Sequence, residues 1–409
     1  MGMSSKKYQI PAIRFEGFTD TWEQREFEDV IISIQTGTNL LGSESNHGTA
    51  LIKMGNVQRG FFSFKKVEFL NENEQVEEKN MANFGDFLFN TRNTLELVGK
   101  GATWFGKNDE YAFNSNIARF TFEGINTTFF NYLYNTPQMI KQVQARAVGT
   151  TSVAAVYPKD LNSMKFWIPS ANEQQKIGAF FKQLDDTIDL HQYQLDNYKV
   201  LKKALLKKIF NQELRFKDEH GNDYPKWINK TVNDIGDVVT GTTPSTQEKT
   251  YYNNGVYPWV TPTDIDRKNI NSTPRKLTEQ GLSKGRVLPE NTILVTCIAS
   301  IGKNAILKQK GSCNQQINAI VCNEKHNYEF VYYLMEKNTE VLKSLAGKGT
   351  MDIVNKDTFS KMQITIPCLE EQVRIGEFLS LLEGKIEDEQ KLVNLMKKQK
   401  QGLMQQMFV

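Results

Sequence analysis

Residues 168–174 read Ile-Pro-Ser-Ala-Asn-Glu-Gln, and residues 366–372 repeat the pattern as Ile-Pro-Cys-Leu-Glu-Glu-Gln. Each copy leads into a long stretch without proline, in which apolar residues recur in steps of four and three. Corresponding positions lie 198 residues apart, as Ile177 and Ile375 illustrate. This spacing is typical of a heptad seam and predicts two equivalent long helices. Ser170 and Glu173 have the spacing of a capping box at the start of the first helix.

A long helix with one apolar stripe needs a partner, and the nearest candidate is its own repeat. We therefore expect the two stripes to pack against each other as a coiled coil. The first stripe consists of Ile177, Phe181, Leu184, Ile188, Leu195, Tyr198 and Leu205. The second consists of Ile375, Leu379, Leu382, Ile386, Val393, Met396 and Leu403.

Composition indicates an ordinary globular protein of more than one domain. The chain has 409 residues, of which 39% are hydrophobic and 24% are charged, and that length exceeds a single hydrophobic core. No apolar run approaches the ~18 residues of a membrane span, so we expect no membrane association and a cytoplasmic location. The four cysteines lack metal-like spacing, which favours reduced, buried thiols and no metal site. A formal charge of +3 permits nucleic-acid binding without arguing for it.

The segments that precede the two helices are also repeated. Trp22 and the run Thr36-Gly37-Thr38 correspond to Trp227 and the run Thr240-Gly241-Thr242. Further matches are Leu51–Val57 with Trp259–Ile265, Asn114–Ile117 with Asn314–Ile317, and Gly149–Ser152 with Gly347–Thr350. Strand-like runs and short amphipathic helices occur in both halves, so we expect an α+β protein with two tandem mixed α/β domains.

The repeated frame carries two different sets of intervening residues. Positions 58–84 and 266–289 share almost nothing in length or composition. One scaffold with two different faces is typical of a protein that recognises two different things. We expect the two helices to pack as an antiparallel coiled coil, which relates the two domains by a pseudo-two-fold axis. Such an arrangement suits duplex DNA, as in repressors whose heads bind two half-sites.

The doubled Ile-Pro-x-x-x-Glu-Gln pattern with its long helix, the Trp followed by Thr-Gly-Thr, and the paired variable segments resemble the specificity subunit of type I restriction–modification enzymes. The resemblance extends from about Ile10 to Phe408, and it rests on the repetition of the same motifs in the same order in both halves of the chain. It implies that each variable region is a target recognition domain that reads one half of a split DNA sequence. It also implies that the chain is not an enzyme.

By the same resemblance, residues 10–168 and 224–366 would be the two recognition domains. Residues 169–211 and 367–409 would be the spacer helices, and residues 212–223 the connecting loop. The helices would set the gap between half-sites and help to dock two methyltransferase subunits. Separate restriction and translocase subunits would cleave the DNA. Cofactors would be absent from this chain, with S-adenosylmethionine, ATP and Mg expected in the partner subunits.

Two alternatives remain at this point. A DNA methyltransferase with its own recognition domains would need an Asn/Asp-Pro-Pro-aromatic loop, which does not occur in the chain. Residues 101–108 imitate a phosphate-binding loop but end in Asn108, which lacks the hydroxyl that binds magnesium. The four histidines are scattered and suggest no catalytic residue. A coiled-coil scaffold that binds no DNA would explain the helices but not two large, divergent domains.

Donor-rich segments at equivalent places are the candidates for DNA contact. Small hydroxyls and backbone amides suit phosphate contacts, which suggests Thr36, Gly37, Thr38, Thr150, Thr151, Ser152, Thr242, Thr243, Lys348 and Thr350. Side chains that can address base edges are Asn56, Gln58, Arg59, Arg92, Thr263, Asp264, Arg267 and Lys303, with Lys53 and Thr261 in the matched segments. Lysines 199, 202, 203, 207 and 208 could track phosphates, but cations at a helix C-terminus are also favourable by themselves.

Overall fold

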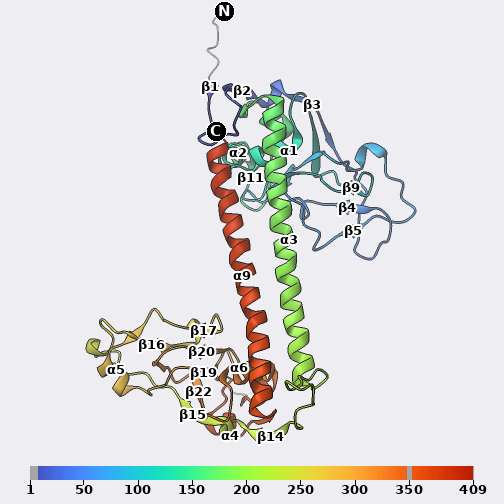
Figure 1. The fold of residues 1–409 in the computed structure, drawn as a ribbon. Coiled ribbons are helices and arrows are strands. Elements are labelled where there is room, and N and C mark those ends of the chain that lie inside the picture. The colour runs from blue at the N-terminus through green and yellow to red at the C-terminus, as the bar shows by residue number, and fades with distance from the viewer. Residues whose placement is uncertain (1–7, 348–351, 409) are drawn as a thin grey trace, which may run out of the picture. The chain divides into compact units, whose positions relative to one another are not determined.

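The computed structural model describes residues 8–347 and 352–408, and it divides into two compact units. The first unit contains the chain up to Gln192 together with the segment from Leu392, and the second contains Tyr193–Lys391. Two long helices, α3 (Ala171–Phe210) and α9 (Leu369–Met407), contribute a segment to each unit (Figure 1). Among the described helices, none is both long and apolar enough to cross a bilayer.

We call the domain that precedes α3 the first head and the domain between α3 and α9 the second head. The first head is built on a four-stranded antiparallel sheet in the order β3-β10-β6-β8. Helices α1 (Thr127–Tyr134) and α2 (Pro137–Gln144) pack against this sheet through one aromatic-rich core. The sheet strands are β3 (Ile31–Thr36), β6 (Phe87–Asn90), β8 (Gly101–Thr103) and β10 (Ile117–Phe122). An outer lobe adds β4 (Ala50–Ile52), β5 (Glu68–Phe69) and β9 (Tyr111–Phe113), in which β4 pairs parallel with β9.

Smaller elements complete the first head. A second three-stranded sheet consists of β1 (Tyr8–Gln9), β2 (Trp22–Glu26) and β13 (Lys165–Ile168), and a third of β7 (Arg92–Asn93), β11 (Val148–Gly149) and β12 (Ala154–Ala155). The 3₁₀ helices are Phe27–Asp29, Glu78–Asn80 and Pro158–Leu161. Sequence dictates where α1 begins, because the Asn126 side chain accepts a hydrogen bond from the Phe129 amide.

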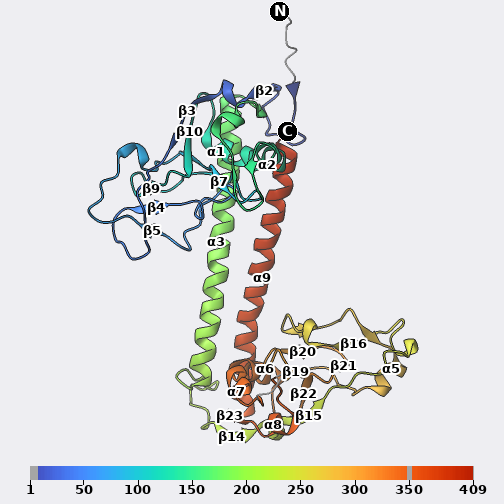
Figure 2. The same ribbon diagram turned by 180° about the vertical axis from the view of Figure 1, so that it is seen from behind.

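The second head repeats this plan with a five-stranded sheet, β15-β22-β19-β20-β17 (Figure 2). Its strands are β15 (Gly236–Thr240), β17 (Asn269–Ile270), β19 (Thr292–Thr296), β20 (Asn304–Leu307) and β22 (Ile317–Cys322). The outer lobe contains β16 (Tyr257–Val260), β18 (Lys276–Leu277), β21 (Ser312–Cys313) and α5 (Glu279–Lys284). As in the first head, β16 pairs parallel with β21, so the fold is duplicated down to the strand pairing.

The remaining elements of the second head follow the same order. They are β14 (Ile228–Thr231), α4 (Val232–Ile235), α6 (Tyr328–Lys337), α7 (Thr339–Ser344), α8 (Lys356–Ser360), β23 (Gln363–Ile366) and the 3₁₀ helices Lys249–Tyr251 and Pro262–Asp264. Helix α6 begins as α1 does, because the Asn327 side chain accepts from the Phe330 amide. The expectation of two mixed α/β heads followed by long helices is confirmed.

The repeated Glu-Gln pair at the start of each long helix binds the head. Both oxygens of Glu173 accept hydrogen bonds from Arg14, at 2.6 and 2.7 Å. Glu371 accepts from Arg215 at 3.1 and 2.6 Å. Both glutamates are 0% exposed, so each buried charge is paired in bidentate geometry. The Glu173 carboxylate, which the sequence suggests as part of a capping box, thus binds Arg14.

The neighbouring glutamines connect the same helices to α1 and α6. Gln174 accepts a hydrogen bond from the backbone amide of Asn126, the residue that caps α1, at 2.9 Å. Gln372 accepts from the amide of Asn327, the cap of α6, at 3.0 Å. The sequence pattern that leads into each long helix thus places the first helix of each head.

Within each unit, the two helix segments run antiparallel. In the first unit, Phe181 near the start of α3 contacts Phe408 just after α9, with ring centroids 5.7 Å apart. In the second unit, Leu195 of α3 shares a buried cluster with Leu382 and Ile386, which lie in the first half of α9. The antiparallel pairing expected from the duplicated stripe is confirmed inside both units.

The stripe residues divide among three buried clusters. Ile177 and Phe181 belong to the core of the first head, whereas Ile375 and Leu379 belong to the core of the second. Leu195, Leu382 and Ile386 form a cluster between the helices alone. Ile188 and Val393 are buried, and Leu184, Tyr198, Leu205, Met396 and Leu403 are half-buried.

In each unit, a lysine contact occurs where α3, α9 and the first helix of the head come together. In the first unit, Lys400 of α9 binds Asp185 of α3, and its ammonium lies 5.2 Å from the ring centroid of Tyr132. In the second unit, Lys202 of α3 binds Glu383 of α9, 5.5 Å from the ring centroid of Tyr333. Both pairs obey the 198-residue offset. Each lysine therefore joins two helix segments and the first helix of a head.

The electrostatic environment keeps Lys202 charged. Burial lowers the pKa of its ammonium, but attraction by Glu336 and Glu383 outweighs burial, and the net pKa is raised. The Lys202 Nζ lies 3.0 Å from a Glu336 oxygen. Lys202, which the sequence suggests as a possible phosphate contact, thus connects α3 to α6 and α9 within the second unit.

We expect Phe408→Ala to lower the free energy of unfolding of the first unit by about 3–5 kcal/mol, the usual cost of truncating a buried aromatic ring. Phe408 is 8% exposed and contacts the rings of Trp22, Phe129 and Phe181. Denaturant titration with hydrogen exchange would measure the decrease and locate it. The control, Phe84→Ala, removes a ring that is 66% exposed and should cost less than about 0.5 kcal/mol. Equal decreases would contradict this packing.

Candidate nucleic-acid interface

The two Thr-Gly-Thr segments join the central sheet to the outer lobe. The Gly37 amide donates to the Ile117 carbonyl and the Thr38 amide to the Phe113 carbonyl. Gly241 and Thr242 repeat these bonds to Ile317 and Cys313. A Cβ atom on Gly37 would lie 1.9 Å from the Phe113 carbonyl oxygen, and one on Gly241 would lie 2.2 Å from that of Asn314. The glycines therefore permit close backbone packing, while exposed Thr36 and Thr243 remain accessible from solvent.

The segments after β4 and β16 form the same turn in both heads. The Asn56 side chain accepts from the Lys53 amide at 2.8 Å, and the Asp264 carboxylate accepts from the Thr261 amide at 2.8 Å. Asn56 also donates to two backbone carbonyls and is buried. Asp264 additionally accepts from the Thr261 hydroxyl. These contacts favour a turn-forming role for Asn56 and Asp264 over base contact, whereas Thr263 is exposed.

A polar group lines the edge of the first head's variable segment. Lys100 donates to the Gln58 side chain at 2.6 Å, and Arg59 donates to the Glu96 carbonyl at 3.1 Å. Burial lowers the pKa of Arg59 and, with repulsion from Arg59, that of Lys100. Arg59 also lines a cavity of about 800 Å³ in the first unit. One terminal nitrogen of its guanidinium is buried without a hydrogen-bond partner within the described chain. By contrast, Lys53 is paired with Glu68 at 2.8 Å.

Arg92 and the glycine loop come together in the first head. Strand β7, which begins at Arg92, pairs with β12, and β12 pairs with β11. The turn between β11 and β12 carries Thr150, Thr151 and Ser152, all of which are exposed. The Leu95 amide donates to the Thr151 carbonyl and fixes this turn beside the loop that follows Arg92. The exposed guanidinium of Arg92 and three hydroxyl side chains therefore lie at one edge of the first head, beside the small sheet of β7, β11 and β12.

In the second head, the predicted base contacts Arg267 and Lys303 lie just before β17 and β20, which pair with each other. Both are exposed, and Arg267 pairs with Asp266 at 2.9 Å. The hydrogen bond and attraction of Asp266 raise the pKa of Arg267. Lys303 lies close enough to Asp266 to contribute to its lowered pKa. The predicted Lys348 and Thr350 lie outside the described residues.

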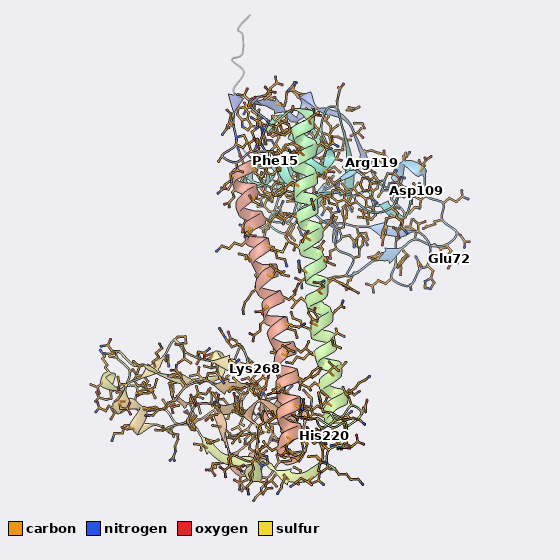
Figure 3. The ribbon with its side chains drawn as sticks, in the orientation of Figure 1. Phe15, Glu72, Asp109, Arg119, His220 and Lys268 are labelled. Carbon is orange, nitrogen blue, oxygen red and sulfur yellow. The ribbon has the colours of Figure 1, made fainter. Side chains whose placement is uncertain are left out.

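Lys268, next to Arg267, was not predicted from sequence. It is 6% exposed and donates to Tyr333 at 3.0 Å and to Ser380 of α9 at 2.7 Å (Figure 3). It also forms an ion pair with Glu329. One lysine thereby connects the variable segment to α6 and α9 inside the second unit. A lone lysine in a polar run carries no sequence signal for such burial, because its partners lie far away in the chain.

The acidic, histidine and cysteine side chains are the groups that could bind a metal ion. Within residues 8–347 and 352–408, no cluster of three His, Cys, Asp or Glu side chains could hold a metal ion. Burial raises the pKa of Cys297 to about 11 and that of Cys313 to about 12, so both thiols stay protonated at neutral pH. The accessible chemistry of the two edges is hydrogen-bond donation and positive charge, which suits a polyanionic ligand.

Comparison with known proteins gives a match over most of the chain. The profile of the type I restriction modification DNA specificity domain matches residues 19–198 and again 224–397. The MjaIX specificity subunit of Methanocaldococcus jannaschii is 34% identical over 46% of this chain, which covers 45% of that relative. The putative MjaX specificity subunit of the same organism is 23% identical over 94% of the chain and 92% of its own length. The chain thus spans less than half of the first relative and nearly all of the second.

Solved structures share the fold. The type I system S subunit from M. genitalium has a TM-score of 0.65 at 12% identity and covers 98% of this chain and 99% of its own. A second structure, which concerns complex assembly and conformational transition of a type I R-M system, has a TM-score of 0.52 at 14% identity, with 94% and 96% covered. At these identities the likeness concerns the fold alone.

We expect Gly37→Ala and Gly241→Ala each to destabilise their own unit by at least about 1–3 kcal/mol, the usual range for overpacking. The added methyl would collide with backbone carbonyls that hold the outer lobe. Gly55→Ala is the matched control, since its Cβ would meet nothing within 4 Å. Melting temperatures of the three variants give the comparison. If all three melt like the parent protein, these glycines are not packing positions.

Proposed function

Because the chain belongs to the type I restriction modification DNA specificity family, we propose that it reads a split DNA target, with one head for each half-site. The observation that carries the proposal is the duplicated frame with unlike variable segments. Strand pairing, helix caps and the Arg–Glu contacts recur in both heads, whereas residues 58–84 and 266–289 do not correspond. Two readers on one scaffold are suited to two different half-sites.

The accessible donors supply the proposed contacts. In the first head, we assign Arg92 to base reading, and Thr150–Ser152 to phosphate contact. In the second head, we assign Arg267 and Lys303 to base reading, and Thr263 supplies a hydroxyl. Arg59 would reach bases only if a small shift released it from the Glu96 carbonyl.

The proposed partners follow from the family. The subunit would assemble with two methyltransferase subunits and with restriction and translocase subunits in the cytoplasm, and the partners would carry all catalysis. S-adenosylmethionine, ATP and Mg would bind to those partners. Residues 169–211 and 367–409 would act as spacers between the recognition domains 10–168 and 224–366, with 212–223 as the connecting loop.

Exchange of one head tests the proposal. We expect that replacing residues 15–165 with the equivalent region of a relative changes one half of the methylated motif and leaves the other half unchanged. The exchange keeps Arg14 and Glu173, so the contact between head and helix is preserved. Methylation mapping in cells that also contain the methyltransferase partner gives the motif. The reciprocal exchange in residues 224–366 is the control and should change only the other half. A change in both halves from either exchange would refute one head per half-site.

Helix insertion tests the spacer role. Four residues inserted after Gln194 and four after Leu392 would add ~6 Å of rise to each helix. Both positions lie near the boundary between the compact units and obey the 198-residue offset. At ~3.4 Å per base pair, we expect a gap longer by about one or two base pairs and unchanged half-sites. Some stability should be lost, because four residues interrupt the heptad repeat. An unchanged gap with full methylation would rule out the spacer role.

A further inference from the structure

The outer lobe of the second head contains a basic pocket that the sequence did not suggest. It has a volume of about 590 Å³. Its lining consists of Thr246, Lys249, Tyr252, Asn253, Pro274, Arg275 and Lys276. No acidic side chain lines the pocket, and none of its three cations forms an ion pair in the described parts of the chain. Cations held together without an anion repel one another, so a bound anion would relieve this repulsion.

Backbone contacts hold the pocket walls in place. Lys276 pairs with Pro258 in the ladder between β18 and β16, and the Arg275 carbonyl accepts from the Trp259 amide. The ring of Tyr252 packs edge-on against Trp259, with centroids 6.1 Å apart. The Tyr252 hydroxyl donates to the Pro244 carbonyl at 2.6 Å. The backbone of Arg275 and Lys276 and the ring of Tyr252 are therefore held in place beside one another.

The pocket adjoins a segment whose hydroxyls suit phosphate contact. Tyr252, which lines the pocket, donates its hydroxyl to the carbonyl of Pro244, and Pro244 directly follows Thr243. Thr243 is exposed there. A phosphate backbone that passes Thr243 would continue into the pocket without leaving the second head.

The equivalent place in the first head has the opposite charge. Leu51 is the counterpart of Trp259, because each stands one residue before the strand position that pairs with Phe113 or Cys313. Glu68 lies across from Leu51, where Arg275 lies across from Trp259. The loop that follows Glu68 adds Glu72, Glu74, Glu77 and Glu78, and Glu72 is labelled in Figure 3. Glu68 is paired with Lys53, so among the described residues the first outer lobe has no unpaired cation at the place of Arg275.

Two other described grooves with lysines differ from this pocket. The groove at Lys202 contains Glu336 and Glu383, and the cavity at Lys400 contains Asp185, Asp186 and Asp189. In both, acids neutralise part of the charge and already bind the central lysine. Of these three described places, only the outer-lobe pocket presents cations that have no acid beside them.

We propose that this pocket binds a backbone phosphate of the DNA duplex beside the second half-site, and that the first head makes no equivalent contact. The inference rests on the proposed function and adds a phosphate contact that only the second head makes. Lys249, Arg275 and Lys276 supply the charge, and Thr246 and Asn253 supply polar groups. Such a contact strengthens binding but reads no base, because phosphates carry no direct sequence information.

The test uses the full chain assembled with its methyltransferase partner. Affinity for duplex DNA that contains the methylated motif is measured over a salt series for the parent complex, Arg275→Gln, and Lys249→Gln with Arg275→Gln and Lys276→Gln combined. We expect affinity to fall about threefold to tenfold in the single variant and further in the triple variant. The slope of log affinity against log salt should decrease by about one for each phosphate interaction that the substitutions remove. The methylated motif should stay the same.

Arg286→Gln is the matched control, since it removes an exposed arginine of the same head that does not line the pocket. It should leave the slope unchanged. Phosphate-ethylation interference on the parent complex gives a second readout that needs no variant. We expect interference beside the second half-site that disappears in Arg275→Gln, and no matching signal beside the first.

Several outcomes would overturn the inference. Unchanged affinity and slope in folded variants would show that the pocket binds no phosphate. Weaker assembly with the methyltransferase at unchanged DNA affinity would assign the pocket to an acidic protein surface instead. Equal interference beside both half-sites would remove the asymmetry. If the parent complex fails to bind its motif at all, the proposed function itself is wrong, and that result is distinct from a weakened grip at one phosphate.

Discussion

A lysine that bridges two helices and rests on a tyrosine ring of the head is the contact on which each unit depends. Lys400 with Asp185 and Tyr132, and Lys202 with Glu383 and Tyr333, repeat this arrangement. The ammonium group is partly buried in both units, and leaving it without an acidic partner there would cost free energy. The pair therefore specifies how helix, helix and head meet, and the same offset in both units makes the two frames equivalent.

The head is fixed to its helix by a second set of buried polar contacts. The Glu173–Arg14 and Glu371–Arg215 pairs hold the chain before each head, and Gln174 and Gln372 hold the caps of α1 and α6. Close backbone packing at the two glycines then carries the outer lobe. Buried hydrogen bonds and ion pairs, and not only apolar packing, thus determine the position of each variable segment relative to its helix.

Because the duplicated strands, caps and helix contacts maintain the fold of both heads, the residues of the variable segments can differ. Both heads retain strand pairing, caps and turns, while accessible charge differs between them. The first outer lobe has Glu68, paired with Lys53, where the second has Arg275 in a basic pocket. Recognition of unlike half-sites and unequal contact with the backbone are compatible with the same fold, because surface side chains contribute little to the packing that maintains it.

The sequence by itself determined the duplication, the long helices and their apolar stripes, because heptad spacing and the 198-residue offset are local patterns that can be read directly. It could not assign roles to single polar residues. Asn56 and Asp264 look like base readers in the sequence, yet each closes a turn, and Lys202 looks like a phosphate contact, yet it binds Glu336 and Glu383. Only the tertiary structure shows these contacts, since the acids that bind Lys202 lie far away along the chain, and the turns at Asn56 and Asp264 depend on where β4 and β16 end. Lys268 and the pocket at Arg275 became visible for the same reason.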